Sequence, residues 1–140
     1  MTSYLSHLEC TVCGKTYSHN QLANVSACCG KVLYARYDLA RIRSEVDRDR
    51  LTERPNGMWQ FAELLPVEDP ANIVSLGEGG TPLIRTSNLS AKLGVTNLYV
   101  KEEGLNPTGT FKARGISAAV SKGLELGATG FTMPSAGNAA

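Results

Sequence analysis

The stretch NPTGTFKARGISAAVSKGLELG, residues 106–127, sets a turn containing proline and glycine directly before a lysine and a segment of helical periodicity. Ile116, Val120 and Leu124 recur at the spacing of one helix face. Gly127 is a typical C-terminal stop. The sequence therefore predicts a helix that starts close to the lysine and ends at this glycine.

Lys112 lies in the first turn of that helix if Thr108 or Thr110 is the N-cap. The positive end of the helix dipole disfavours an ammonium group there. Burial beside Phe111 would lower the lysine pKa further. Both effects favour a neutral amine, the form that attacks a carbonyl carbon. The competing interpretation is an ordinary exposed lysine, which explains the shaped turn before it poorly.

Strand-like and helical segments alternate from about residue 72 onward. Residues 98–101 and 130–134 are predicted strands, and each is followed by a loop and a helical segment. This order predicts an α/β fold with a parallel sheet, in which all strand-to-helix loops emerge at one rim. We therefore expect residues 103–110 and 134–138 to be neighbours at a ligand-binding rim.

The tetrapeptide SAGN after the second predicted strand offers groups that bind anions. Ser135 supplies a hydroxyl, and Gly137 allows close backbone approach. The following helix N-terminus would present free N–H groups to a carboxylate. Asn138 can donate a hydrogen bond to a phenolate-like oxygen. An ordinary serine or Asx turn is the alternative.

Composition limits the classes of protein that fit. The 140 residues carry a net charge of +1 and are 42% hydrophobic, as in a soluble globular protein. No basic field favours nucleic acid, and no apolar run approaches the roughly 20 residues that span a bilayer. With no signal peptide at the N-terminus, we expect a cytoplasmic location. No internal repeat is evident.

Three segments are expected: a Cys-bearing module at 1–37, a helix and connector at 38–71, and the start of an α/β domain at 72–140. The second segment opens with a predicted helix over 39–54, whose alternating charges indicate a solvated face. The third ends just as a new helix would begin. We therefore expect the chain to be part of a longer protein.

Four cysteines lie within 20 residues, which in a reducing compartment indicates a metal site before disulfides. Cys10 and Cys13 form a C-x-x-C-G zinc knuckle. Cys28 and Cys29 are adjacent in SACCG, and adjacent cysteines bind one metal only with an unusual backbone. A site of all four thiols, a three-thiolate site, a His7 or His19 ligand, and a module without zinc all remain alternatives.

The turn NPTGTFKARG resembles the cofactor-lysine signature of the fold-type II pyridoxal-phosphate enzymes, and SAGNAA resembles their substrate-carboxylate loop. LGEGGTPL at 76–83, together with a Cys-bearing N-terminal segment ending LYARYDL, is similar to the threonine synthase family. The resemblance covers nearly the whole chain and rests on three motifs in the expected order.

This resemblance implies a lyase that converts O-phosphohomoserine and water into threonine and phosphate. It also implies pyridoxal phosphate as cofactor and allows a homodimer. The four cysteines make zinc a second candidate. The cofactor-phosphate cradle of the family comes from sequence beyond residue 140. The implied roles are Lys112 as the catalytic and cofactor-binding lysine, Asn138 as a cofactor contact, and Ser135, Ala136, Gly137 and Thr81 as substrate contacts.

Two alternatives remain. A serine/threonine dehydratase or a cysteine synthase would carry a similar lysine turn and GN loop, although the Cys-bearing extension and LGEGGTPL disfavour both. A zinc-ribbon module that binds nucleic acid or protein is the alternative of another class. Near-neutral charge, and the lack of clustered basic or aromatic residues around the cysteines, disfavour it.

Overall fold

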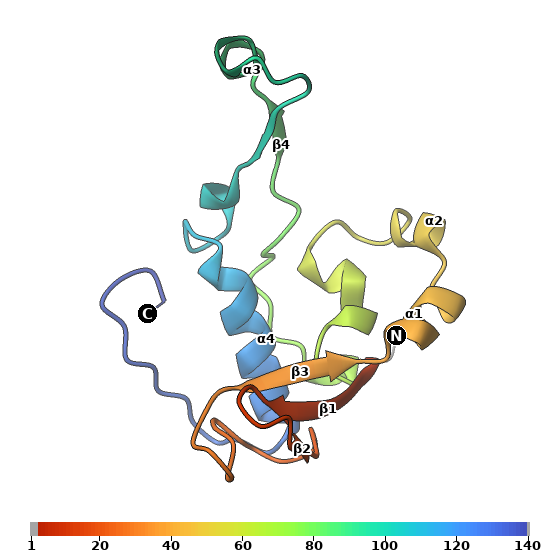
Figure 1. Ribbon diagram of the computed structural model, residues 1–140, viewed down its shortest axis with the longest axis vertical. Helices are drawn as coiled ribbons and strands as arrows, with labels where there is room; N and C mark the ends of the chain where they lie inside the picture. Colours follow the sequence, from red (N-terminus) through yellow and green to blue (C-terminus); the bar gives the residue numbers. More distant parts are fainter. Residues whose placement is uncertain (1–2, 140) are drawn as a thin grey trace.

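A computed structural model describes residues 3–139. A three-stranded sheet and a two-stranded sheet lie at opposite ends of the molecule in Figure 1, with a connector and a long helix between them. The elements are β1 (Leu5–Cys10), β2 (Thr16–Tyr17), β3 (Leu33–Tyr37), α1 (Leu39–Glu45), α2 (Arg48–Leu51), η1 (Met58–Leu64), η2 (Pro70–Asn72), β4 (Leu83–Arg85), α3 (Ser87–Leu93), β5 (Tyr99–Lys101), η3 (Glu103–Leu105) and α4 (Lys112–Glu125).

The N-terminal sheet has the order β2-β1-β3, and both pairings are antiparallel. Its central strand begins and ends on buried residues, Leu5 and Cys10. The start of β1 is tied to the connector, because the Tyr4 amide donates to the Glu63 carbonyl over 3.0 Å. The Cys-bearing turns extend from the opposite end of the sheet.

The single helix expected over 39–54 is wrong in one respect, because α1 and α2 are separate. Asp47 causes the break: its side chain accepts from the Asp49 amide and caps a new helix. Asp38 caps α1 in the same way. The expected solvated face is confirmed, since neither helix contains a buried residue.

The predicted parallel sheet is not found among residues 3–139, where both sheets are antiparallel. β5 confirms the predicted strand at 98–101, but it pairs with β4 in a hairpin that carries α3 at its tip. Because β4 and β5 are joined by a short helical loop, the chain reverses direction between them.

Residues 130–134 do not form the predicted strand. A strand needs a hydrogen-bonded neighbour, and this segment has none in the described part of the chain. Phe131 packs instead on α4, where a Cβ at Gly123 would lie 2.5 Å from its ring. No helix begins within 135–139, and Ala140 lies outside the described residues.

The long helix α4 agrees with the prediction at its C-terminal end. Gly127 has a φ of +83°, and its amide donates to the Leu124 carbonyl over 2.9 Å. At the N-terminal end the predicted threonine caps are wrong: Phe111 is the N-cap and makes no side-chain capping bond. Thr110 Oγ1 makes only a long contact, 3.4 Å, with the Lys112 amide.

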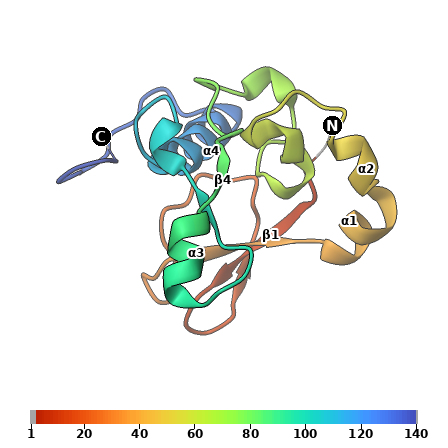
Figure 2. The ribbon, with the colours of Figure 1, turned by 90° about the horizontal axis from the view of Figure 1, so that it is seen from above.

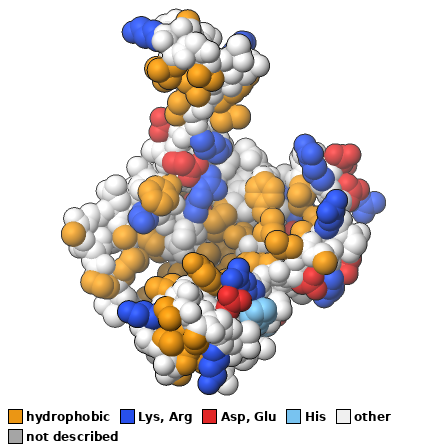
Figure 3. Space-filling view, viewed as in Figure 1, with side chains coloured by type: hydrophobic (Ala, Val, Ile, Leu, Met, Phe, Trp, Pro, Cys, Tyr) orange, Lys and Arg blue, Asp and Glu red, His pale blue; other side chains and the backbone are white. Residues whose placement is uncertain are grey.

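Little apolar surface is buried. The buried hydrophobic residues are Leu5, Cys10, Met58, Ala62, Val67 and Ala113. Large hydrophobic side chains are exposed on the β4–α3–β5 tip, which stands away from the rest of the molecule (Figures 1 and 3). Of the helices in residues 3–139, none combines the length and apolarity that a membrane crossing requires.

Candidate functional site

Lys112 is the first residue of α4, as the sequence predicts. Its side chain is exposed, and Nζ lies 4.7 Å from the centroid of the Phe111 ring. The expected burial by that ring is absent, because Phe111 is itself 58% exposed. Within residues 3–139 the lysine makes no ion pair.

The turn before the lysine is anchored by Asn106, which is 4% exposed. Its carbonyl accepts from the Gly109 amide over 2.8 Å, and Gly109 has a φ of +69° that favours glycine. Its Oδ1 accepts from the Gly79 amide over 3.0 Å, and its Nδ2 donates to Glu103. Asn106 thus joins the lysine turn to the LGEGGTPL turn.

Glu103 and Arg114 form a two-pronged ion pair across the same turn. Arg114 Nε and Nη2 lie 2.7 and 2.8 Å from the two carboxylate oxygens. Thr81 Oγ1 donates to Glu103 Oε1 over 2.5 Å. The hydrogen bonds from Arg114, and then from Thr81, hold the pKa of Glu103 well below its usual range. This carboxylate stays ionised and fixes the first turn of α4.

Glu78 is the carboxylate of the LGEGGTPL turn, and it is buried, with 1% of its surface exposed. Its oxygens accept from Trp59 Nε1 over 3.0 Å, from Ser75 Oγ over 3.0 Å and from the Leu76 amide over 2.9 Å. Burial alone would raise its pKa, but hydrogen bonds from Ser117 and from its other neighbours outweigh burial and lower it.

Ser117 and Ser121 fix the face of α4 that lies opposite Lys112. Ser117 Oγ accepts from Trp59 Nε1 and donates to the Val74 carbonyl over 2.8 Å. Ser121, which is fully buried, accepts from the Val74 amide over 2.9 Å. A cavity of about 190 Å³ lies between α4 and residues 74–78, and Thr108 of the lysine turn also lines it.

The loop predicted to bind substrate and cofactor, residues 135–138, makes no hydrogen bond to the lysine turn in the described chain. Ser135, Ala136, Gly137 and Asn138 are all exposed. In the described residues the hydrogen bonds of this loop are internal, between Ser135 Oγ and Gly137. The segment leads away from the C-terminal end of α4 in both ribbon views (Figures 1 and 2). Its approach to Lys112 stays a prediction.

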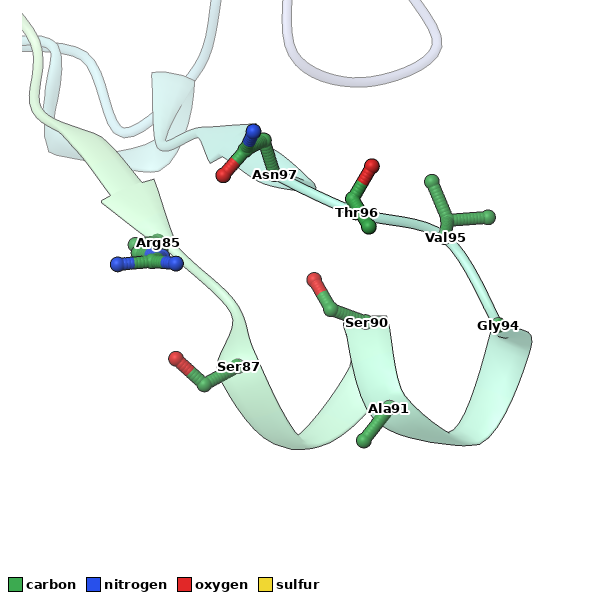
Figure 4. Close-up of a pocket in the computed structure, with 8 residues that line it drawn as sticks. All are labelled: Arg85, Ser87, Ser90, Ala91, Gly94, Val95, Thr96 and Asn97. Atoms are coloured by element: carbon green, nitrogen blue, oxygen red, sulfur yellow. The ribbon is translucent and has the colours of Figure 1, made fainter.

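A second hollow, of about 540 Å³, lies at the tip of the molecule. Figure 4 shows that polar side chains from β4, α3 and the following loop surround it, among them Arg85, Ser90 and Asn97. None of the predicted site residues lines it. It is an open depression in the hairpin rather than part of the lysine site.

The four cysteines do converge. Their Sγ atoms all lie within 4.8 Å of one another, and the four are free thiols. Neither His7 nor His19 belongs to this group in the described chain. Hydrogen bonding with Ser26, followed by the amides of Cys13 and Val12, lowers the pKa of Cys10 to about 6.

Comparison with known proteins identifies the family. Residues 74–140, which contain the lysine turn, match the family described as "Pyridoxal-phosphate dependent enzyme". Residues 74–140 belong to that family. Within it, 131 residues are 45% identical to threonine synthase of Methanocaldococcus jannaschii, a match covering 93% of this chain and 32% of the relative. Threonine synthase of Methanosarcina acetivorans is 41% identical over 132 residues, covering 94% of this chain and 32% of the relative.

Other threonine synthases match a shorter part of the chain. The enzyme of Bacillus sp. (strain ULM1) is 51% identical over 79 residues, covering 56% of this chain and 22% of the relative. The chain thus spans about a third of the length of the first two relatives.

Three residues that support the family's lysine turn were not predicted from the sequence: Glu103, Asn106 and Arg114. Glu103 and Arg114 are 11 residues apart with a turn between them, so no helical spacing connects them. The one available signal is the run of opposite charges on either side of the proline- and glycine-containing turn. The same contacts show that Thr81, predicted as a substrate contact, is buried and donates to Glu103.

Proposed function

We propose that this chain is the N-terminal part of a threonine synthase, which converts O-phosphohomoserine and water into threonine and phosphate. The observation that carries the proposal is the 45% identity to a threonine synthase across 93% of the chain, which includes the Cys-bearing segment. Family membership alone would fit a dehydratase or a cysteine synthase equally well.

Lys112 is the proposed catalytic residue and the covalent anchor of the cofactor. Bound pyridoxal phosphate would supply the electron sink that stabilises carbanions. The residues of the lysine turn fit this group: the lysine is exposed, it pairs with no carboxylate among residues 3–139, and the turn before it leaves open space around Gly109. Nζ would then carry protons between carbon atoms of the substrate.

Ser135, Ala136 and Gly137 are proposed to hold the substrate carboxylate, and Asn138 to donate to the ring hydroxyl of the cofactor. Their exposure leaves them accessible to a ligand, which would replace the bonds between Ser135 Oγ and Gly137. The role requires the loop to lie beside Lys112. Thr81 would act indirectly, by holding Glu103 and hence the first turn of α4. Cytoplasmic location and a homodimer stay predictions.

Reduction of the cofactor onto the protein tests the lysine assignment. The full natural protein that contains this sequence is incubated with pyridoxal phosphate, reduced with borohydride and digested, and the adduct is located by peptide mass. We expect one adduct on Lys112, lost in Lys112→Ala and retained in Lys92→Ala, an exposed lysine on α3. An adduct scattered over several lysines would contradict the assignment.

The substrate is tested separately with the same protein. Phosphate release from O-phosphohomoserine is compared with ammonia release from serine or threonine. Phosphate release that is abolished by Lys112→Ala supports threonine synthase. Ammonia release alone would identify a dehydratase and leave only the family assignment standing.

A further inference from the structure

The two Cys-bearing turns repeat one backbone pattern that their sequences partly hide. Residues 10–15 read CTVCGK and residues 26–31 read SACCGK. In each turn the first amide donates to the sixth carbonyl, and the fifth amide donates back to the first carbonyl. The matched bonds are Cys10 N to Lys15 O, 2.9 Å, and Gly14 N to Cys10 O, 3.0 Å, against Ser26 N to Lys31 O, 2.7 Å, and Gly30 N to Ser26 O, 2.8 Å.

The glycines complete the match, since Gly14 and Gly30 have φ values of +72° and +60°. Superposing the two turns by sequence position places Cys29 opposite Cys13, as the second ligand of a knuckle. It places Ser26 opposite Cys10, where a knuckle needs its first thiolate. The expectation of no internal repeat is therefore wrong, because a serine interrupts the C-x-x-C signature.

Ser26 keeps the position of a ligand but not its chemistry. It is buried, with 1% of its surface exposed. Its Oγ accepts a hydrogen bond from Cys10 Sγ over 3.3 Å and another from the Lys31 amide over 3.1 Å. A hydroxyl in this position is already hydrogen-bonded, and it is not one of the thiolate, imidazole or carboxylate groups that bind zinc in proteins.

Cys28 supplies the missing thiol from the neighbouring position. Its counterpart in the first turn is Val12, which is 66% exposed and outside the cluster. Cys28 instead directs Sγ to 3.2 Å from Cys13 Sγ, while its amide donates to the Tyr17 hydroxyl over 3.1 Å. The phenol on β2 thus holds the backbone that brings two adjacent cysteines to one centre.

We propose that Cys10, Cys13, Cys28 and Cys29 bind one Zn²⁺, with Cys28 replacing Ser26 as the fourth ligand and Ser26 remaining as a hydrogen-bonding partner of the Cys10 sulfur. Tetrahedral zinc with Zn–S bonds of about 2.3 Å sets sulfur atoms about 3.8 Å apart. The observed limit of 4.8 Å needs only a small contraction. Binding releases the remaining thiol protons to solvent.

Metal titration of the whole chain under reducing conditions tests the ligand set, with Co²⁺ as a spectroscopic probe and Zn²⁺ as its competitor. The intensity of sulfur-to-cobalt charge transfer follows the number of bound thiolates. We expect one Co²⁺ per chain with the spectrum of four thiolates, displaced by one Zn²⁺. Cys28→Ser should lower the intensity to about three quarters and weaken Zn²⁺ binding at least tenfold.

The double variant Ser26→Cys/Cys28→Ala keeps the test decisive even if a single variant folds poorly. It rebuilds a regular C-x-x-C knuckle and should restore the four-thiolate intensity. Ser26→Ala is the matched control and should also keep four thiolates. Full intensity in Cys28→Ser, three-thiolate intensity in the double variant, or a chain with four reduced thiols that binds no metal would overturn the proposal. None of these readouts depends on threonine synthase activity.

Discussion

The Cys-bearing turns and the glycine-rich turn around Glu78 both hold distant segments of the chain together, but they use different side chains to do so. Each gathers distant segments where little apolar surface is buried. Around Glu78 and Glu103 the carboxylates are satisfied by Trp59, Ser75, Thr81 and Arg114. Among the thiols, the cysteines of the cluster mainly face one another.

The difference teaches where each region obtains its stability. A buried carboxylate with several donors is stable without any ligand, because each polar group has its hydrogen-bond partner inside the protein. Four thiols that face one another gain little until a cation binds them. We therefore expect the two regions to respond independently to changes at either centre.

Metal removal should give the largest effect and should be confined to the N-terminal sheet. Structural zinc contributes about 10–16 kcal/mol of apparent folding free energy in small zinc domains at neutral pH. Hydrogen exchange with and without a chelator should show loss of amide protection in β1, β2 and β3. Amides of α4 serve as the internal control, and equal loss there would show that the regions are coupled.

Gly79→Ala should give the next largest effect and should act on the glycine-rich turn. Gly79 has a φ of +94°, and a Cβ there would collide with the Met58 amide nitrogen. Left-handed strain and overpacking together cost about 4 kcal/mol. Gly115→Ala is the matched control: it lies in α4 with open space around its Cα, and alanine should stabilise it by about 0.5–1 kcal/mol. Urea unfolding measures both, and similar midpoints would contradict this account.

Glu78→Ala should destabilise the chain by about 3 kcal/mol, because it removes the acceptor of the Ser75 hydroxyl and of the Leu76 amide, and one of the two acceptors of the Trp59 indole N–H. Glu53→Ala, an exposed carboxylate on the connector, should change stability by less than about 0.5 kcal/mol. Urea unfolding again provides the measurement. Retained Co²⁺ binding in Glu78→Ala would confirm that the two centres are independent.

The smallest effect concerns pH. Arg114 and Thr81 lower the pKa of Glu103 in the folded chain. The resulting stability is present above the unfolded-state value, about 4.3, and is lost as the pH falls below it. Glu103→Gln should therefore flatten the decline in unfolding free energy between about pH 5 and pH 3. An unchanged slope would show that other carboxylates cause the decline.

Elements whose sequence pattern is local could be predicted, whereas the pairing of strands, which depends on distant segments, could not. The strand at 99–101 and the stop at Gly127 follow from alternation and from glycine. Strand direction does not, because the hairpin of β4 and β5 depends on which segments pair. The turn at 26–31 was obscured because one serine broke the pattern by which knuckles are found.

The contacts of α4 determine the direction in which Lys112 faces. A helix turns by about 100° per residue, so Arg114, Ser117 and Ser121 project roughly opposite to position 112. These three residues hold Glu103 and Val74. Rolling the helix by one position would break all of these bonds at once. The chain therefore fixes the direction of the Lys112 side chain with a set of anchors on the reverse side of α4, none of which contacts the lysine itself.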